Sequence, residues 1–227
     1  MPTTKRILDR LLIVACALLA YIIVDVLFVL PFQSKWHHPL FSSLILLVVG
    51  FAALITCLLR QYQHFSSDMT PPDHHGWHYT PAARKRVLRG LLIGFAILFC
   101  VQLVSTILVT TGTIAQSANE TALNKLTTLA GLPMTLSITI AAPITEELIF
   151  RGLLMNAFLP NRTRRAQVLS ICLSSALFTS VHTPTTLIDV LLYFSMGVGL
   201  AVTYAYTRDL KCSVGLHILN NVLSTFL

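Results

Sequence analysis

The sequence predicts an all-α membrane protein, a polytopic helical bundle of about seven transmembrane helices with its N-terminus in the cytosol and its C-terminus outside. Three observations support this fold class: the composition, the spacing of apolar runs and the placement of basic residues. Of the 227 residues, 55% are hydrophobic and only 11% are charged, and the mean hydropathy is +0.74. Because soluble domains carry about 25% charged residues, the composition excludes an ordinary soluble globular protein.

Seven apolar windows approach the length of about 20 residues that a membrane-spanning helix needs. They lie at roughly 11–32, 40–59, 88–110, 131–158, 166–182, 186–207 and 213–227. The first window follows Lys5 and Arg6, as the apolar core of a signal peptide does. It is longer than such a core and lacks a convincing cleavage site, so we interpret it as the first transmembrane helix.

Basic residues gather in every second loop. One set of loops carries Lys5, Arg6, Arg10, Arg60, Arg84, Lys85, Arg86, Arg89, Arg162, Arg164, Arg165, Arg208 and Lys211. The alternate loops hold only Lys35 and Lys125. Because cytoplasmic loops are enriched in Lys and Arg, this alternation predicts the N-in, C-out orientation. It also accounts for the net charge of +7, so the expected partner is the lipid bilayer and not nucleic acid.

The polar segments between the windows give weaker indications. In a cytosolic loop at about 61–87, the residues His74, His75 and His78 form either a weak metal site or part of a solvated linker. We favour the linker, because their spacing fits no ligand geometry. The segment 112–130 is polar enough to form an interfacial helix outside the bilayer. The five cysteines are scattered without a C-x-x-C pair, so neither a disulfide framework nor a thiolate metal site is expected.

Two adjacent glutamates, Glu146 and Glu147, lie in the middle of the fourth window. A carboxylate at the centre of a transmembrane helix costs on the order of 3 kcal/mol to insert, so such residues usually mark a functional site. Glu147 and Arg151 are spaced i,i+4 and can pair on one helix face. Glu146 points away from that face and is left to act on water as a general base. A charge-paired triad that only pins two helices is the competing interpretation.

Two histidines and an amide accompany the glutamates. His182 follows Phe178 by one helical turn, and counting from the hairpin before it at 1.5 Å per residue places it level with the glutamates. His217 and Asn221 share one face of the last helix and supply two N–H donors that suit an oxyanion; holding a water or a metal is the alternative for this pair. For the asparagine, a polar contact between helices is the alternative. The count also places the site toward the cytosolic half of the bilayer.

The motifs E-E-x-x-x-R from Glu146, F-x-x-x-H from Phe178 and H-x-x-x-N from His217 occur in this order on three helices. Together they resemble the motifs of the CAAX protease and bacteriocin-processing (CPBP) family, also called the Abi family. The resemblance covers residues 131–227, which we expect to form the catalytic core. Residues 1–110, with the first three helices, lie outside it.

The resemblance implies an intramembrane endopeptidase in which Glu146 and His182 activate water. It further implies that His217 and Asn221 hold the oxyanion. The supporting residues would be Glu147, Arg151 and Phe178.

Members of the family are described both as metalloproteases and as glutamate proteases. The sequence favours glutamate-activated water without a cofactor, because nothing in it resembles H-E-x-x-H, although two histidines and a carboxylate meet the ligand count of a zinc site. The expected substrate is a membrane-associated peptide or protein, in bacteriocin processing or self-immunity at a bacterial plasma membrane. A non-catalytic membrane immunity protein that only binds its target is the alternative. The oligomeric state is left open.

Overall fold

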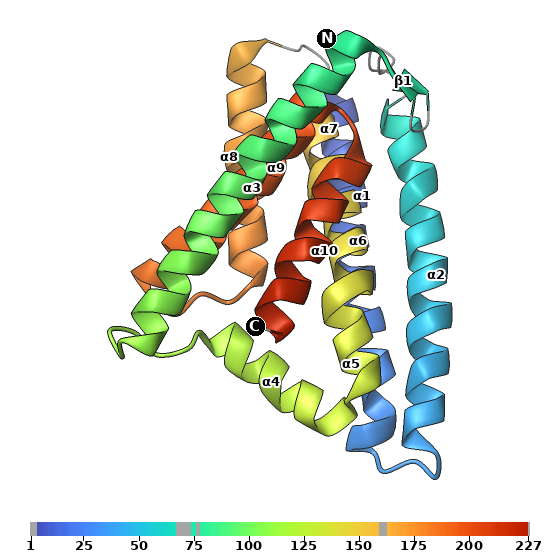
Figure 1. The fold of residues 1–227 in the computed structure, drawn as a ribbon. Helices are drawn as coiled ribbons and strands as arrows, with labels where there is room; N and C mark the ends of the chain where they lie inside the picture. Colours follow the sequence, from blue (N-terminus) through green and yellow to red (C-terminus); the bar gives the residue numbers. More distant parts are fainter. Residues whose placement is uncertain (1–3, 67–73, 76–77, 159–162, 227) are drawn as a thin grey trace.

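The computed structural model describes residues 4–66, 74–75, 78–158 and 163–226. Figure 1 shows one helical bundle with a short helix across one end. Its separate helices are α1 (Thr4–Gln33), α2 (Pro39–Ser66), α3 (Pro81–Thr110), α4 (Ala118–Ala130), α8 (Arg164–Val181), α9 (Leu187–Thr207) and α10 (Leu210–Phe226). A central helix runs through the consecutive segments α5 (Leu132–Leu136), η1 (Ser137–Ala141), α6 (Ala142–Glu147), η2 (Leu148–Met155) and α7 (Asn156–Phe158). The two-residue strands β1 (His74–His75) and β2 (His78–Tyr79) pair in antiparallel fashion between α2 and α3.

The predicted all-α fold class is confirmed. In the described part of the chain, each of the seven apolar windows falls, to within one residue at either end, inside one helix or inside the central helix. In the described part of the chain, four helices are long and apolar enough to cross a membrane, namely α1, α2, α3 and α9. The first three expose large apolar side chains along much of their length, which suits contact with lipid tails. The count of seven spans and the N-in orientation stay predictions.

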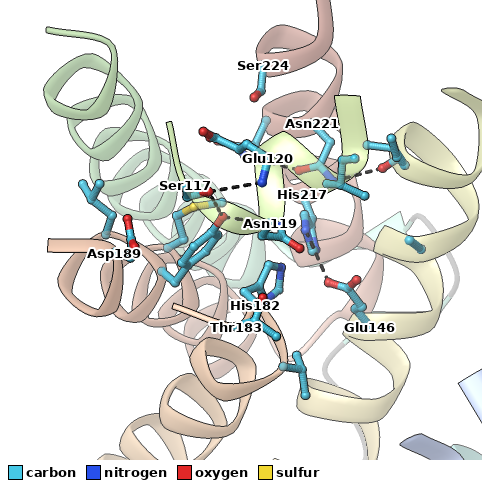
Figure 2. A pocket seen from close by; sticks show the side chains of 18 of the residues that line it. Ser117, Asn119, Glu120, Glu146, His182, Thr183, Asp189, His217, Asn221 and Ser224 are labelled. Carbon is cyan, nitrogen blue, oxygen red and sulfur yellow. Dashed lines mark hydrogen bonds and ion pairs between the residues drawn. The ribbon is translucent and has the colours of Figure 1, made fainter. Parts of the chain in front are cut away.

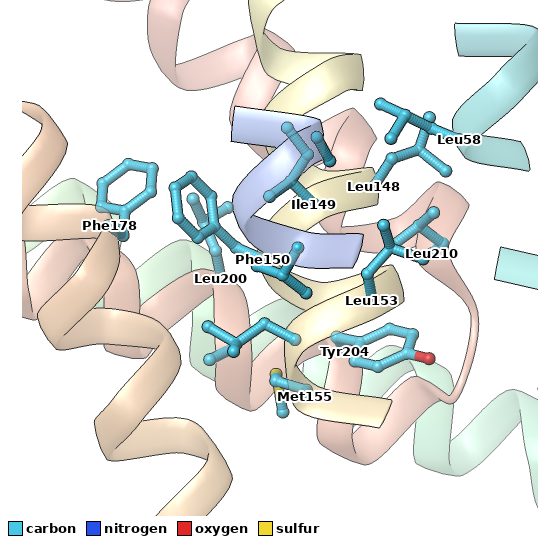
Figure 3. Close-up of a cluster of buried hydrophobic side chains, with 14 of the residues drawn as sticks. Leu58, Leu148, Ile149, Phe150, Leu153, Met155, Phe178, Leu200, Tyr204 and Leu210 are labelled. Atoms are coloured by element: carbon cyan, nitrogen blue, oxygen red, sulfur yellow. The ribbon is translucent and has the colours of Figure 1, made fainter. Parts of the chain in front are cut away.

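The described side chains of the central helix are buried from Thr145 onward, and the helix twice departs from regular α-helical geometry. Pro143 has no backbone N–H to donate, and the preceding segment η1 is π-helical. A second π-helical segment, η2, follows the glutamates, and all of its side chains are buried. Figure 3 shows its apolar side chains among those of α2, α8, α9 and α10. Because lipid tails are as apolar as these side chains, such contacts stabilise the bundle through close packing and not through exclusion of water.

Glycines set the position of α9 between its two neighbours. A Cβ atom on Gly94 of α3 would lie 1.9 Å from Oγ1 of Thr203 on α9. A Cβ atom on Gly197 of α9 would lie 2.9 Å from Cα of Ser175 on α8. Small residues are typical of such close helix crossings in membranes. They bring α9 near enough to take part in the site described below.

Buried polar contacts fill the end of the bundle where the N-terminus lies. Arg10 is only 4% exposed, donates to the carbonyl oxygen of Asn156 at 3.1 Å and lies over the ring of Phe65. The Asn156 side chain donates in turn to the hydroxyl of Tyr204 at 2.9 Å. The sequence placed Arg10 in a basic loop. It lies instead within α1 and contacts the end of the central helix.

The helix α4 lies across the opposite end of the bundle (Figure 1). The hydroxyl of Ser117 accepts a hydrogen bond from the backbone N–H of Glu120, which caps its N-terminus. The helix ends at Gly131, whose φ of 56° is readily adopted by glycine. The expected helix within 112–130 is therefore present.

Candidate active site

The two glutamates lie side by side on α6 but have different surroundings. Glu147 is fully buried, and its Oε1 accepts a hydrogen bond from Nη1 of Arg151 at 2.7 Å. The same guanidinium donates through Nη2 to the carbonyl of Gly197 at 3.0 Å and lies 5.0 Å from the ring centroid of Phe178. The i,i+4 pair expected from the sequence is thus formed. Glu146 faces a cavity instead.

His217 on α10 connects the two carboxylates. Its Nδ1 lies 3.0 Å from Oε1 of Glu147, and its Nε2 lies 3.8 Å from Oε2 of Glu146. Because the carboxylate of Glu147 is paired with Arg151 and can only accept, Nδ1 is the donor in the shorter contact. The ring is 2% exposed. The buried ion pair therefore orients His217 so that its second nitrogen points toward Glu146.

His182 is held at the C-terminal end of α8. Its Nδ1 donates to the carbonyl oxygen of Phe178 at 2.7 Å, because a carbonyl oxygen can only accept. The imidazole packs between two aromatic rings, with centroid distances of 4.3 Å to Phe178 and 4.8 Å to Tyr193. A neutral His182 with this tautomer keeps its Nε2 lone pair free to accept a hydrogen bond.

Asn221 lies one turn after His217 on α10. Its amide nitrogen donates to the carbonyl oxygen of Ile138 at 3.0 Å. This carbonyl belongs to the π-helical segment η1, so the asparagine joins α10 to the central helix. The contact is of the kind expected for polar groups between helices. It uses one of the two amide hydrogens.

All four residues predicted to be catalytic line one cavity of about 420 Å³, which Figure 2 shows: Glu146, His182, His217 and Asn221. The three predicted supporting residues are buried behind this wall: Glu147, Arg151 and Phe178. The structure thus brings every candidate residue together. Among the described residues, no group of three or more His, Cys, Asp or Glu side chains is arranged to hold a metal ion. The side chains of the loop histidines His74, His75 and His78 lie outside the described part.

Two residues of α1 belong to the site although the sequence motifs did not include them. The hydroxyl of Tyr21 donates to Oε1 of Glu146 at 2.9 Å. Asp25, one turn further along α1, lines the same cavity. A signal for Asp25 was present, because it is the single charged residue of the window 11–32 and carries the same insertion cost as the glutamates.

The contact with Tyr21 also fixes the depth of the site. Tyr21 lies close to the middle of the 30-residue helix α1, so Glu146 is level with the centre of the bundle. The sequence count had placed the site toward the cytosolic half. That count treats neighbouring helices as parallel, whereas α3, α9 and α10 are visibly inclined in Figure 1.

Comparisons with known proteins give one family match and two relatives. Residues 128–223 match the family described as Type II CAAX prenyl endopeptidase Rce1-like. The chain is 26% identical over 198 residues to the UPF0177 protein YvdC of Lactococcus lactis subsp. lactis (strain IL1403), a match that covers 84% of this chain and 68% of the relative. It is 29% identical over 143 residues to the membrane-embedded CAAX protease MroQ of Staphylococcus aureus (strain USA300), covering 61% of this chain and 57% of the relative. No solved structure gives a match.

A polar site of this kind inside an apolar helical bundle, together with these matches, defines a membrane-embedded peptide hydrolase. Over residues 128–223 the chain resembles the CAAX protease and bacteriocin-processing family, and its apolar helices make it an integral membrane protein. The family match covers the part of the chain that carries the three motifs. Because the alignment with MroQ spans little more than half of that protein, substrates and partners are proposals.

Proposed function

We propose that the chain is an intramembrane endopeptidase that cleaves a peptide bond of a membrane-associated substrate with a water molecule activated by Glu146. The observation that carries this proposal is the contrast between the two glutamates. Glu147 is buried and paired with Arg151, whereas Glu146 faces the cavity beside two histidines. A structural triad needs no such cavity. A general base does need one, because its water and its substrate must both reach it.

The chemical steps follow from the atoms that face the cavity. A water molecule beside Glu146 gives a proton to the carboxylate while its oxygen attacks the substrate carbonyl carbon. His182 orients this water by accepting its second hydrogen at Nε2. The proton on Glu146 then passes to the leaving nitrogen as the C–N bond breaks, which restores the carboxylate and releases the acid and amine products.

Stabilisation of the oxyanion is assigned to α10. His217 lies between the carboxylates of Glu146 and Glu147, and it donates to the oxyanion in the form that carries a proton on each ring nitrogen. Its Nε2–H then donates to the oxyanion. The second amide hydrogen of Asn221, which the contact with Ile138 does not use, supplies another donor. Removing one such donor typically costs about 10²–10³ in kcat.

A membrane-associated substrate is supported by a second, apolar groove of about 260 Å³ between α3 and α10. The groove shares Gln102, Asn220 and Ser224 with the cavity. An apolar segment of the substrate can therefore lie in the groove while the adjoining backbone reaches Glu146. Both relatives are bacterial, which supports a bacterial plasma membrane as the location. Bacteriocin processing or self-immunity is the role that we assign within this family.

The test is comparative peptidomics of membranes from cells that carry the intact protein or Glu146→Gln. This isosteric change should remove about 10²–10⁴ of the cleavage rate, with unchanged protein levels in the membrane. Asp9→Asn, the same chemical change at an exposed position of α1, is the matched control and should leave cleavage intact. Cleavage that persists with Glu146→Gln would refute the proposal. Protection from a toxic peptide that survives alanine at Glu146, His182 and His217 together would indicate a protein that only binds its target.

A further inference from the structure

The catalytic cavity extends from Glu146 toward one end of the bundle. Its lining residues on α10 begin at His217 and continue to Thr225, close to the C-terminal end of that helix. The lining residues on α3 lie in the second half of that helix, at 101–109. Further lining residues lie at 180–183, where α8 ends and the next loop begins. In Figure 1 these helix ends point toward α4. The loop before α4 and its first turns supply further wall residues, among them Ser117 and Glu120.

The other end of the bundle is closed by packed side chains. In the described part of the chain, none of the residues that line the cavity comes from η2 or α7, which continue the central helix beyond the glutamates. All side chains of η2 are buried. Beyond them, Arg10, Asn156 and Tyr204 form the buried polar contacts described above. A peptide therefore has no opening to Glu146 from that end among the described residues.

The closed end is also the basic end. Four helices have an end there, namely α2, α3, α8 and α9. Basic residues lie in or next to these ends: Arg60, Arg84, Lys85, Arg164, Arg165 and Arg208. The end near α4 has Lys35 and Lys125. Because basic loops remain in the cytosol, the predicted N-in orientation places the closed end toward the cytosol and the open end away from it.

We infer that the site takes an extended peptide segment presented from the non-cytoplasmic side of the membrane, past α4. The inference rests on the proposed function, and it differs from the sequence count, which placed the site toward the cytosolic half of the bilayer. The contacts that α4 makes are consistent with this helix covering the entrance to the cavity. Tyr193 shares a hydrogen bond of 2.9 Å with Ser117, accepts one from Asn119 at 3.4 Å and packs its ring against His182. The position of α4 is thereby tied to a catalytic histidine.

The test is labelling with a membrane-impermeant maleimide in a variant whose five native cysteines are serine. Ser224→Cys reports on the cavity, because Ser224 lines its open end. Thr113→Cys, in the exposed loop before α4, and Ala82→Cys, at the exposed start of α3, report on the two membrane faces. We expect Ser224→Cys and Thr113→Cys to react in intact cells and Ala82→Cys to react only after permeabilisation.

Two outcomes would overturn the inference. Ser224→Cys could follow Ala82→Cys and react only after permeabilisation, or it could fail to react in both preparations. Labelling does not require catalysis, and the experiment is repeated in the Glu146→Ala background. The labelling result therefore tests the access route alone, and the cleavage assay tests the hydrolytic activity separately.

Discussion

Replacing Arg151 should destabilise the protein by an amount that depends on which of its contacts survive. Arg151→Met leaves the carboxylate of Glu147 buried without its cation, and removing one partner of a buried pair costs about 3–5 kcal/mol. Arg151→Lys keeps the charge. A single ammonium cannot reproduce the fork that reaches both Glu147 and the carbonyl of Gly197. Losing one hydrogen bond to a charged group costs about 1.5–3 kcal/mol.

Thermal unfolding in detergent micelles measures both effects. For a chain of this size, 1 kcal/mol corresponds to about 2–4 °C in Tm, so Arg151→Met should lower Tm by about 6–20 °C and Arg151→Lys by about 3–12 °C. Combining Arg151→Met with Glu147→Gln removes both charges and should recover part of the loss. Arg165→Met, at an exposed position, is the control and should stay within about 0.5 kcal/mol. A Tm of Arg151→Met equal to that of the native chain would refute the buried-pair reasoning.

Three further predictions concern the site. Tyr21→Phe removes the donor to Glu146 and should lower kcat about 10–100-fold at unchanged KM, whereas Tyr206→Phe, on an exposed face of α9, should not. Elemental analysis of active protein, with the loop histidines replaced, should give no stoichiometric zinc. Zinc that is lost together with activity when either His182 or His217 is replaced would contradict this. Four carboxylates and no Lys or Arg are among the cavity-lining residues of the described part, so substrates with a basic residue beside the scissile bond should be cleaved faster than acidic ones. Burial raises the pKa of the Glu120 carboxyl, so this preference should grow as pH rises and Glu120 ionises, and Glu120→Gln should weaken it; a preference that does not depend on pH or on Glu120 would count against the reasoning.

The sequence predicted the helical class and the site residues for reasons that are local. Helical periodicity alone puts Glu147 and Arg151 on one face, and the structure forms that pair at 2.7 Å. The meeting of His217 with both glutamates could not be derived in the same way. His217 lies six residues after Lys211, whereas Glu147 lies 15 residues before Arg162, so a count from the loops alone does not place them at the same depth. Several helices are inclined in Figure 1, and inclination depends on tertiary packing, which no single segment encodes.

The part played by α1 was missed for a different reason. Asp25 is an intramembrane carboxylate and met the same physical criterion as Glu146. The three motifs all lie within residues 131–227, and Asp25 lies outside them. Tyr21 offered no comparable signal, because a tyrosine in an apolar run is ordinary. Its role depends on the rotation of α1 about its own axis, which decides whether the hydroxyl points to lipid or to Glu146.

The cavity is lined by residues of the motif-bearing region 131–227 and also by residues that precede it. Glu146 is held from α1 by Tyr21, and the ring that packs on His182 is hydrogen-bonded to the N-terminal end of α4. Neither α1 nor α4 carries a motif residue. A fragment of residues 131–227 would keep every predicted catalytic side chain and still lose the donor to Glu146 and the cover of the cavity. The smallest unit that can position its water therefore includes α1 and α4, and the motifs mark the chemistry of the site but not its extent.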